Sequence, residues 1–346
     1  MKLKANWLKR TYFSLTATAA LAFAGLSANA HSETVLNAVF YQPDGNPIVE
    51  LSREALEMVS EETDGRVKFR IYPSSTLVPT TEMANAVDNG TAFMAVWYMP
   101  YMSKTIPLFD IETVPVWTAG TCDAIVDTYE NGLNDLYSEA LANQGMPNVQ
   151  VAGVSMCLPR VLGTTKTPVQ VPDDVKGLRI RSVAAESEMF AEIGANPVNM
   201  TNDQVYEALS RGIVDGMTNA FNVMDERKDL EMIKYVVNTD LTWVLMHVIY
   251  NESMLDKLDE KDREIVQKGM KQVANYVREG LDKRSEHSKE TAPERYGVTV
   301  HQPNDNERKL WLAAAESTRQ KFESKADGDE FIKRGLDLVH TYNPVD

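Results

Sequence analysis

Residues 35–71 read VLNAVFYQPDGNPIVELSREALEMVSEETDGRVKFRI, and this stretch decides the fold class. The apolar run 35–40 predicts a buried strand, and apolar residues then recur at helical spacing over 48–59. Gly65 supplies the left-handed backbone on which helices often end, and residues 67–71 alternate apolar and basic side chains, as in a half-buried strand. Strand, helix and strand in this order are the unit of a parallel, doubly wound α/β sheet.

A helix, a glycine and a strand follow one another in two further stretches of the chain. Residues 82–97 have this layout, and residues 204–217 repeat it with alanine and glycine at the same relative positions. The two strands run into loops that bear aromatic residues, 97–101 and 219–221. Two similar lobes would place these loops at comparable positions, facing one another. Any passage from a helix through glycine to a strand gives the same pattern, so a repeat and a coincidence are both open.

The remaining chain alternates further helices and strands. We predict strands at 149–154, 178–181 and 244–250, and helices at 123–143, 184–194, 255–292 (ended by Pro293), 311–322 and 331–338. A chain of this length exceeds the usual size of one hydrophobic core, so two lobes are expected.

The first 30 residues have the pattern of a secretory signal peptide. Four basic residues within 1–10 precede an apolar run at 15–26, and Ala28-Asn29-Ala30 gives the small-x-small cleavage site. The apolar run has about 12 residues, whereas roughly 20 are needed to cross a bilayer, so a signal peptide is favoured over a membrane anchor. Cleavage after Ala30 would release a periplasmic protein that begins at His31. No later segment is apolar over a spanning length, and we expect no insertion of the mature chain into lipid.

The chain is strongly acidic, with 50 Asp and Glu against 35 Lys and Arg and a formal net charge of −15. The leader carries four of the basic residues and no acidic one, so its removal makes the charge more negative. Nucleic acid and anionic lipid both require a basic surface, and neither is expected as a partner. Because the net charge is negative and repels anions, an anionic ligand would have to be held by positive side chains at its site.

Cysteine and histidine usage predicts neither a metal nor another cofactor. Cys122 and Cys157 are the only cysteines, and an even pair can form a disulfide in an oxidising compartment. The sequence does not place their Cα atoms, so a disulfide and two free thiols are both open. Neither cysteines nor histidines have the spacing of metal ligands.

The sequence gives no positive reason to predict an enzyme. It has no GxSxG, HExxH, Walker or GxGxxG motif. His247 lies in an apolar strand, where a hydrogen-bonded core histidine is favoured over a catalytic one.

The segment 171–181, VPDDVKGLRIR, carries the strongest candidate for ligand binding. A turn leads into a strand whose Ile180 faces the core while Arg179 and Arg181 face the other way. Arg181 stands at the carboxyl end of this strand, which is where open α/β sheets bind ligands. A guanidinium there could clamp a carboxylate through two parallel hydrogen bonds. From position alone, an ordinary surface arginine is favoured over a ligand clamp.

Several segments resemble the solute-binding proteins of TRAP transporters, the DctP-type extracytoplasmic receptors. The resemblance rests on GLRIR at 177–181, GANPVNM at 194–200, VYEAL at 205–209 and GIVDG at 212–216, with GRVKF at 65–69 and YPSSTL at 72–77. These segments occur in matching order over nearly the whole mature chain. No single motif has this specificity.

The resemblance implies a two-lobed, periplasmic-binding-protein-like α/β fold, with each lobe a doubly wound sheet flanked by helices. Crossing strands and a long helix would join the lobes, which we expect at 31–157 plus about 245–285 and at 158–244 plus about 286–346. The implied function is to bind a small organic acid between the lobes and to deliver it to the TRAP membrane permease subunits. The family's carboxylate-clamping arginine falls on Arg181, its site asparagine on Asn219 and a second arginine on Arg160.

Aromatic residues near these positions are candidates for the pocket walls, although core packing explains each of them singly. They are Phe40, Tyr41, Trp97, Tyr98, Tyr101, Phe221 and Trp243. The cluster 97–101 suggests a ligand with an apolar or cationic portion. The ligand itself stays open among dicarboxylates, keto acids, sugar acids, sulfonates and zwitterions, and the oligomeric state is equally open.

Two other functions fit the same lobes. A periplasmic enzyme would need a base or nucleophile at the cleft, for which Glu82, Tyr98 and Cys157 are the local candidates. A receptor could instead present its ligand-bound lobe to a sensor protein.

Overall fold

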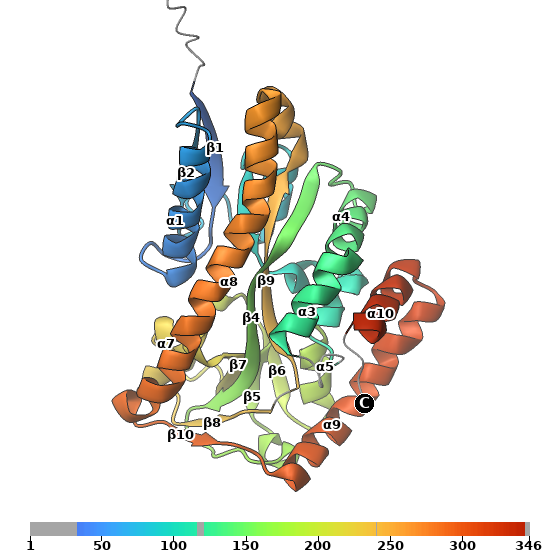
Figure 1. Ribbon diagram of the computed structural model, residues 1–346. Coiled ribbons are helices and arrows are strands. Elements are labelled where there is room, and N and C mark those ends of the chain that lie inside the picture. Colours follow the sequence, from blue (N-terminus) through green and yellow to red (C-terminus); the bar gives the residue numbers. More distant parts are fainter. Residues whose placement is uncertain (1–32, 116–120, 240, 343–346) are drawn as a thin grey trace, which may run out of the picture. The chain divides into compact units, whose positions relative to one another are not determined.

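The structure of the chain is a computed structural model that describes residues 33–115, 121–239 and 241–342 (Figure 1). It opens with strand β1 (Thr34–Val39), helix α1 (Pro47–Glu62) and strand β2 (Val67–Tyr72), and the two strands pair in parallel. The α1 helix begins where the Asn46 side chain accepts a hydrogen bond from the Ile48 N–H. The predicted strand, helix and strand are confirmed. The predicted leader and its cleavage site lie outside the described residues.

The described strands form one sheet in the order β2-β1-β3-β9-β4-β7-β5-β6. The pairs β1–β2, β1–β3, β5–β7 and β5–β6 are parallel, and β9 and β4 run antiparallel to their neighbours. The further strands are β3 (Met94–Trp97), β4 (Val149–Thr164), β5 (Arg179–Ser182), β6 (Asn196–Asn199), β7 (Gly216–Ala220) and β9 (Trp243–Asn251), with β8 (Tyr235–Val237) and β10 (Thr299–His301) paired beside β4.

Strands β4 and β9 connect the two parallel halves of the sheet. The first part of β4, Val149–Pro159, pairs with β9, and the following residues Arg160–Thr164 pair with β7. Figure 1 shows β4 and β9 side by side, with the long helix α8 (Glu260–Tyr296) running along them. The predicted crossing strands and long helix are therefore present.

Helices cover this sheet and place its loops. They are α2 (Met83–Asp88), α3 (Cys122–Thr128), α4 (Asn134–Asn143), α5 (Ala184–Glu192), α6 (Val205–Ser210), α7 (Phe221–Glu226), α9 (Asp305–Ser324) and α10 (Glu330–Tyr342). The repeated layout is seen in both copies, since α2 leads through Gly90 to β3 and α6 through Gly212 to β7. Both glycines have positive φ, 78° and 65°, which glycine adopts without strain.

The buried apolar residues fall into three clusters. The largest is built from β1, β2, β3, the first part of β4, β9 and the first part of α8. Two smaller clusters lie around β5, β7 and β8. The last helix, α10, buries Ile332, Leu336 and Val339 in the largest cluster, so it packs with the first half of the chain.

Several predicted element boundaries are wrong, among them the end of the strand expected at 149–154, which continues to Thr164. The helix expected at 123–143 is interrupted at Asn131 and Gly132, where the glycine has φ 134° and cannot continue a helix. Helix α8 continues past Pro293 and ends at Gly297, whose left-handed φ of 64° sets the boundary. The strand expected at 213–217 begins only at Gly216, because residues 212–215 form the turn that brings Asp215 to Arg179.

Candidate functional site

A pocket lies where the loops after β1 and β3 meet β4, β5, β7 and β9. The space between these elements, including open solvent at its mouth, amounts to about 510 Å³. The lining side chains are Tyr41, Gln42, Asn46, Ile48, Tyr98, Met156, Arg160, Arg181, Val183, Asn202, Asn219, Val223, Glu226, Arg227, Val244 and Met246. The pocket thus combines an apolar middle with three arginines and several amides.

Arg181 stands near the carboxyl end of β5 and is almost completely buried. The pairing of β5 with β6 and β7 fixes its backbone opposite Val198 and Met217. Its Nε and Nη2 donate to the Met200 carbonyl oxygen at 3.1 and 2.8 Å. Among the described residues, no carboxylate oxygen lies within 4.0 Å of the guanidinium. Burial, together with the charge of neighbouring Arg160, lowers the pKa of Arg181, so a bound anion would relieve an unfavourable charge.

Arg160 is held from two sides. Its Nη2 donates to the Tyr98 Oη at 2.9 Å, and its Nη1 lies 3.6 Å from the Glu186 carboxylate. Its Nε is buried and has no partner among the described residues. Glu186 also accepts a hydrogen bond from the Thr218 hydroxyl at 2.6 Å, so its position is fixed by β7. The Nε–H of Arg160 is therefore a donor that a ligand could use.

Asn219 lies in β7 and faces the same pocket as the two arginines. Its Nδ2 donates to the Asn202 Oδ1 at 2.9 Å, and its own Oδ1 accepts the Ala220 N–H. Register explains why it lies here, because β7 pairs with β4 and sets Asn219 opposite Val161, beside Arg160. The structure thus brings together Arg160, Arg181, Asn219, Tyr41 and Tyr98.

The other candidates do not line this pocket. Trp97 and Phe40 are completely buried in the largest cluster, where the Trp97 Nε1 donates to the Thr80 carbonyl at 3.2 Å. Phe221 and Trp243 pack in or against the apolar clusters. Tyr101 lines an adjacent cavity, and its hydroxyl accepts the Asn202 N–H at 3.2 Å.

The candidate catalytic groups are dispersed. Glu82 is exposed and accepts a hydrogen bond from Asn85, while Cys157 is buried in β4. Cys122 and Cys157 are both free thiols, and burial, together with the neighbouring Cys122 thiol, raises the pKa of Cys157. Their oxidation to a disulfide stays a prediction. His247 is a hydrogen-bonded core histidine, 2.8 Å from the Glu112 carboxylate.

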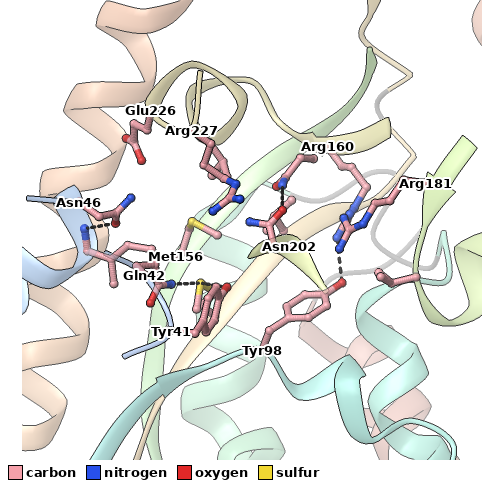
Figure 2. Close-up of a pocket in the computed structure, with 16 residues that line it drawn as sticks. Tyr41, Gln42, Asn46, Tyr98, Met156, Arg160, Arg181, Asn202, Glu226 and Arg227 are labelled. Atoms are coloured by element: carbon pink, nitrogen blue, oxygen red, sulfur yellow. Dashed lines mark hydrogen bonds between the residues drawn. The ribbon is translucent and has the colours of Figure 1, made fainter. Parts of the chain in front are cut away.

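Sequence reasoning missed two charged residues, Glu226 and Arg227. They end the short helix α7, which starts directly after β7 and so returns to the pocket. The Arg227 Nε lies 3.7 Å from the Asp229 carboxylate, which is completely buried and accepts no hydrogen bond from the described residues. The charged run 225–228, which begins six residues after the asparagine of a site strand, was the available signal. Figure 2 shows Glu226 and Asn46 at one end of the pocket and Arg160 and Arg181 at the other, with Arg227 between them.

The described ranges contain neither a candidate metal site nor a candidate membrane-spanning helix. Residues 33–115, 121–239 and 241–342 contain no group of three or more His, Cys, Asp or Glu placed to hold a metal. Within the same part of the chain, no helix has both the length and the apolar character to span a membrane. The pocket offers hydrogen-bond donors for an anion and no assembled nucleophile with its base.

Comparison with known proteins places the chain among solute-binding proteins. The sequence model described as "Bacterial extracellular solute-binding protein, family 7" (DctP) matches residues 40–325. The 2,3-diketo-L-gulonate-binding periplasmic protein YiaO of Escherichia coli is 25% identical over 268 residues, which are 75% of this chain and 80% of that protein. The C4-dicarboxylate-binding periplasmic protein DctP of Vibrio cholerae is 25% identical over 280 residues, 80% and 82% of the two chains.

Solved structures share the fold. The extracytoplasmic solute receptor DctP7 of Bordetella pertussis, which binds pyroglutamic acid, matches with a TM-score of 0.78 and 22% identity, covering 89% of this chain and 99% of that one. The periplasmic ectoine-binding protein of Halomonas elongata also matches at 0.78, with 18% identity and coverage of 89% and 98%. The two-lobed α/β fold expected from the sequence is confirmed by these neighbours.

Proposed function

Because the chain belongs to family 7 of the bacterial extracellular solute-binding proteins, we propose that its pocket captures a small organic acid for a TRAP transporter. The chain would deliver this ligand to the membrane permease subunits. Relatives named as binding proteins for 2,3-diketo-L-gulonate and C4-dicarboxylates support an acid as the ligand class.

The main support for this proposal is the buried guanidinium of Arg181. It lies in a pocket at the carboxyl end of its strand without a counter-charge within 4.0 Å among the described residues. A buried charge is costly unless it is paired, and a ligand carboxylate would supply the pair. Arg160 and Asn219 would add hydrogen bonds, and Tyr41 and Tyr98 would cover the ligand.

We propose that ligand binding closes two lobes over the pocket. From the sequence, one lobe would comprise residues 31–157 plus about 245–285, and the other 158–244 plus about 286–346. Because α10 buries its apolar residues in the largest cluster, we now assign α10 to the first lobe. Strands β4 and β9 would act as the hinge, because they are shared by both halves of the sheet. Pocket residues come from both halves, for example Tyr41 and Arg181, so opening would expose the ligand.

We propose a periplasmic location, with cleavage after Ala30. Sequencing the amino terminus of the exported protein tests this, since it should begin at His31. A chain that retains its first 30 residues in the periplasm would contradict it.

The chain is expected to bind its ligand without converting it. Incubation of the ligand with excess protein followed by mass spectrometry should return the ligand unaltered. A changed mass would favour the periplasmic enzyme instead.

A thermal-shift screen of organic acids tests the binding function. A ligand at one hundred times its dissociation constant should stabilise the protein by about 2.7 kcal/mol and raise its melting temperature by several degrees. Arg181→Ala should abolish this shift. The matched control is Arg179→Ala, on the same strand, since that side chain is half-exposed and pairs with Asp215 at 2.7 Å. Equal shifts in both variants would refute the clamp.

A further inference from the structure

The charges around the pocket leave one arginine and one carboxylate without a partner. Arg160 has Glu186 at 3.6 Å, and Arg227 has Asp229 at 3.7 Å. Arg181 donates only to backbone carbonyls, and no described carboxylate lies within 4.0 Å of it. The pocket therefore holds one arginine that an anion could neutralise.

Glu226 is the matching carboxylate. It lines the pocket, and its Oε1 accepts a hydrogen bond of 3.3 Å from Asn222. Among the described residues, no Lys, Arg or His nitrogen lies within 4.0 Å of its carboxylate. Burial raises the pKa of Glu226 to about 7, partly offset by Asn222 and Arg284, and Asp225 raises it further. The side chain thus lies in the pocket wall without the counter-charge that would stabilise its ionised form.

The acceptors and donors that lack partners lie toward different ends of the pocket. The acceptor end holds Glu226 and, nearby, the Gln42 Oε1, which is buried and has no donor among the described residues. The donor end holds Arg181 and the unpaired Nε of Arg160. Arg227 lies between these ends (Figure 2), and apolar side chains of the crossing strands, Met156, Val244 and Met246, also line the pocket. A ligand that fits this order has an anionic group, an apolar middle and a hydrogen-bond-donating cation.

We propose that the ligand is zwitterionic, with its carboxylate on Arg181 and a protonated amine or amidinium on Glu226. This inference rests on the proposed capture of an organic acid. A plain monocarboxylate would leave the half-buried Glu226 carboxylate without a counter-charge. A dicarboxylate would place its second anion near Glu226 and would have to rely on Arg227, whose charge already has Asp229 beside it.

Matched acids of equal chain length test the proposal. Melting temperatures are measured at pH 8, where the ionised forms of Glu226 and Asp229 predominate because both pKa values are about 7. The probes are ω-amino acids of four to six carbons, the unsubstituted monocarboxylates and the dicarboxylates of the same length. We expect the zwitterions to bind at least about tenfold more tightly than the monocarboxylates or the dicarboxylates. This factor corresponds to the free energy of one hydrogen bond to a charged group.

Glu226→Gln should lower affinity for the zwitterions about tenfold and should not weaken binding of the monocarboxylates. Glu207→Gln is the control, because that exposed glutamate pairs with Arg211 on the surface of α6. A different result would refute the zwitterion proposal: dicarboxylates bind best, and their binding is weakened by Arg227→Ala and not by Glu226→Gln. If binding of the acids still depends on Arg181, the proposed capture of organic acids stands. If no acid in the three sets stabilises the protein, the zwitterion proposal is refuted; organic-acid capture is overturned only when the wider screen of organic acids also gives no shift that depends on Arg181.

Discussion

The Nη2 of Arg160 donates a hydrogen bond of 2.9 Å to the Oη of Tyr98, joining the crossing strand β4 to the loop that follows β3. Both side chains are buried and line the pocket. Burial raises the pKa of Tyr98, so the phenol keeps its proton and accepts the arginine N–H through a lone pair. The phenol oxygen therefore satisfies one donor of a buried cation.

Tyr98→Phe should destabilise the protein, because the Arg160 Nη2 would lose its acceptor inside the protein. Hydrogen bonds to charged groups are worth about 1.5–3 kcal/mol, and we expect a loss of that size in the free energy of unfolding in urea. Tyr276→Phe is the control, since its hydroxyl bonds Glu54 at the surface and its loss should cost less than about 0.5 kcal/mol. Equal losses in the two variants would contradict the role given to Tyr98.

Glu112 and His247 form a second buried polar pair, with both side chains completely inaccessible. The Glu112 Oε1 accepts from the His247 ring at 2.8 Å and from the Tyr129 hydroxyl at 3.0 Å. Removing one member of such a pair costs about 3–5 kcal/mol, and we expect this for His247→Leu and for Glu112→Leu. The double variant should lose clearly less than the sum, as a double-mutant cycle in urea would measure. Additive losses would show that the pair is not coupled.

Asp229 should make stability fall as pH rises. Burial raises its pKa to about 7, with Arg227 and Arg181 opposing the shift. The folded state therefore binds a proton more tightly than the unfolded chain, and the stabilisation present below about pH 4 is lost as pH rises through 7. We expect the melting temperature to fall between pH 5 and 8, and Asp229→Asn to flatten part of that fall. An unchanged slope in the variant would refute this assignment.

Glu226 contributes in the same direction, since its pKa is also raised to about 7. Exposed carboxylates with lowered pKa, such as Glu139 beside Arg334, titrate below this window and leave the slope between pH 5 and 8 unaffected. Glu226→Gln should therefore remove a further part of the slope.

Local patterns predicted the α/β fold because helical spacing, alternation and glycine stops are set by near neighbours. The length of β4 could not be predicted from near neighbours. Its last five residues form a strand only because they pair with β7 and β8, which are distant in sequence. The interruption at Gly132 was likewise hidden, because helical spacing on both sides of it suggests one continuous helix.

At the site, Arg181 and Asn219 could be located through the resemblance, and the structure places both in one pocket. Trp97 could not be assigned, because β3 is buried on both faces and gives no alternation to show which side chains face the pocket. Glu226 and Arg227 depend on how α7 leaves β7, which is a tertiary relationship. Charge pairing around a pocket is decided by such relationships and not by spacing.

Gly269 lets helix α8 approach helix α1, and its substitution gives the last prediction. A Cβ at this position would lie 2.6 and 2.9 Å from the two γ carbons of Val59, a side chain with little rotamer freedom. Alanine ordinarily stabilises a helix by about 1 kcal/mol relative to glycine. Here the clash should dominate, and Gly269→Ala should lower the free energy of unfolding by about 1–3 kcal/mol. Adding Val59→Ala should recover part of this loss by removing both γ carbons. Gly328→Ala is the control, because nothing lies within 4 Å of its Cβ position. A higher melting temperature for Gly269→Ala alone would show that the two helices can separate at little cost.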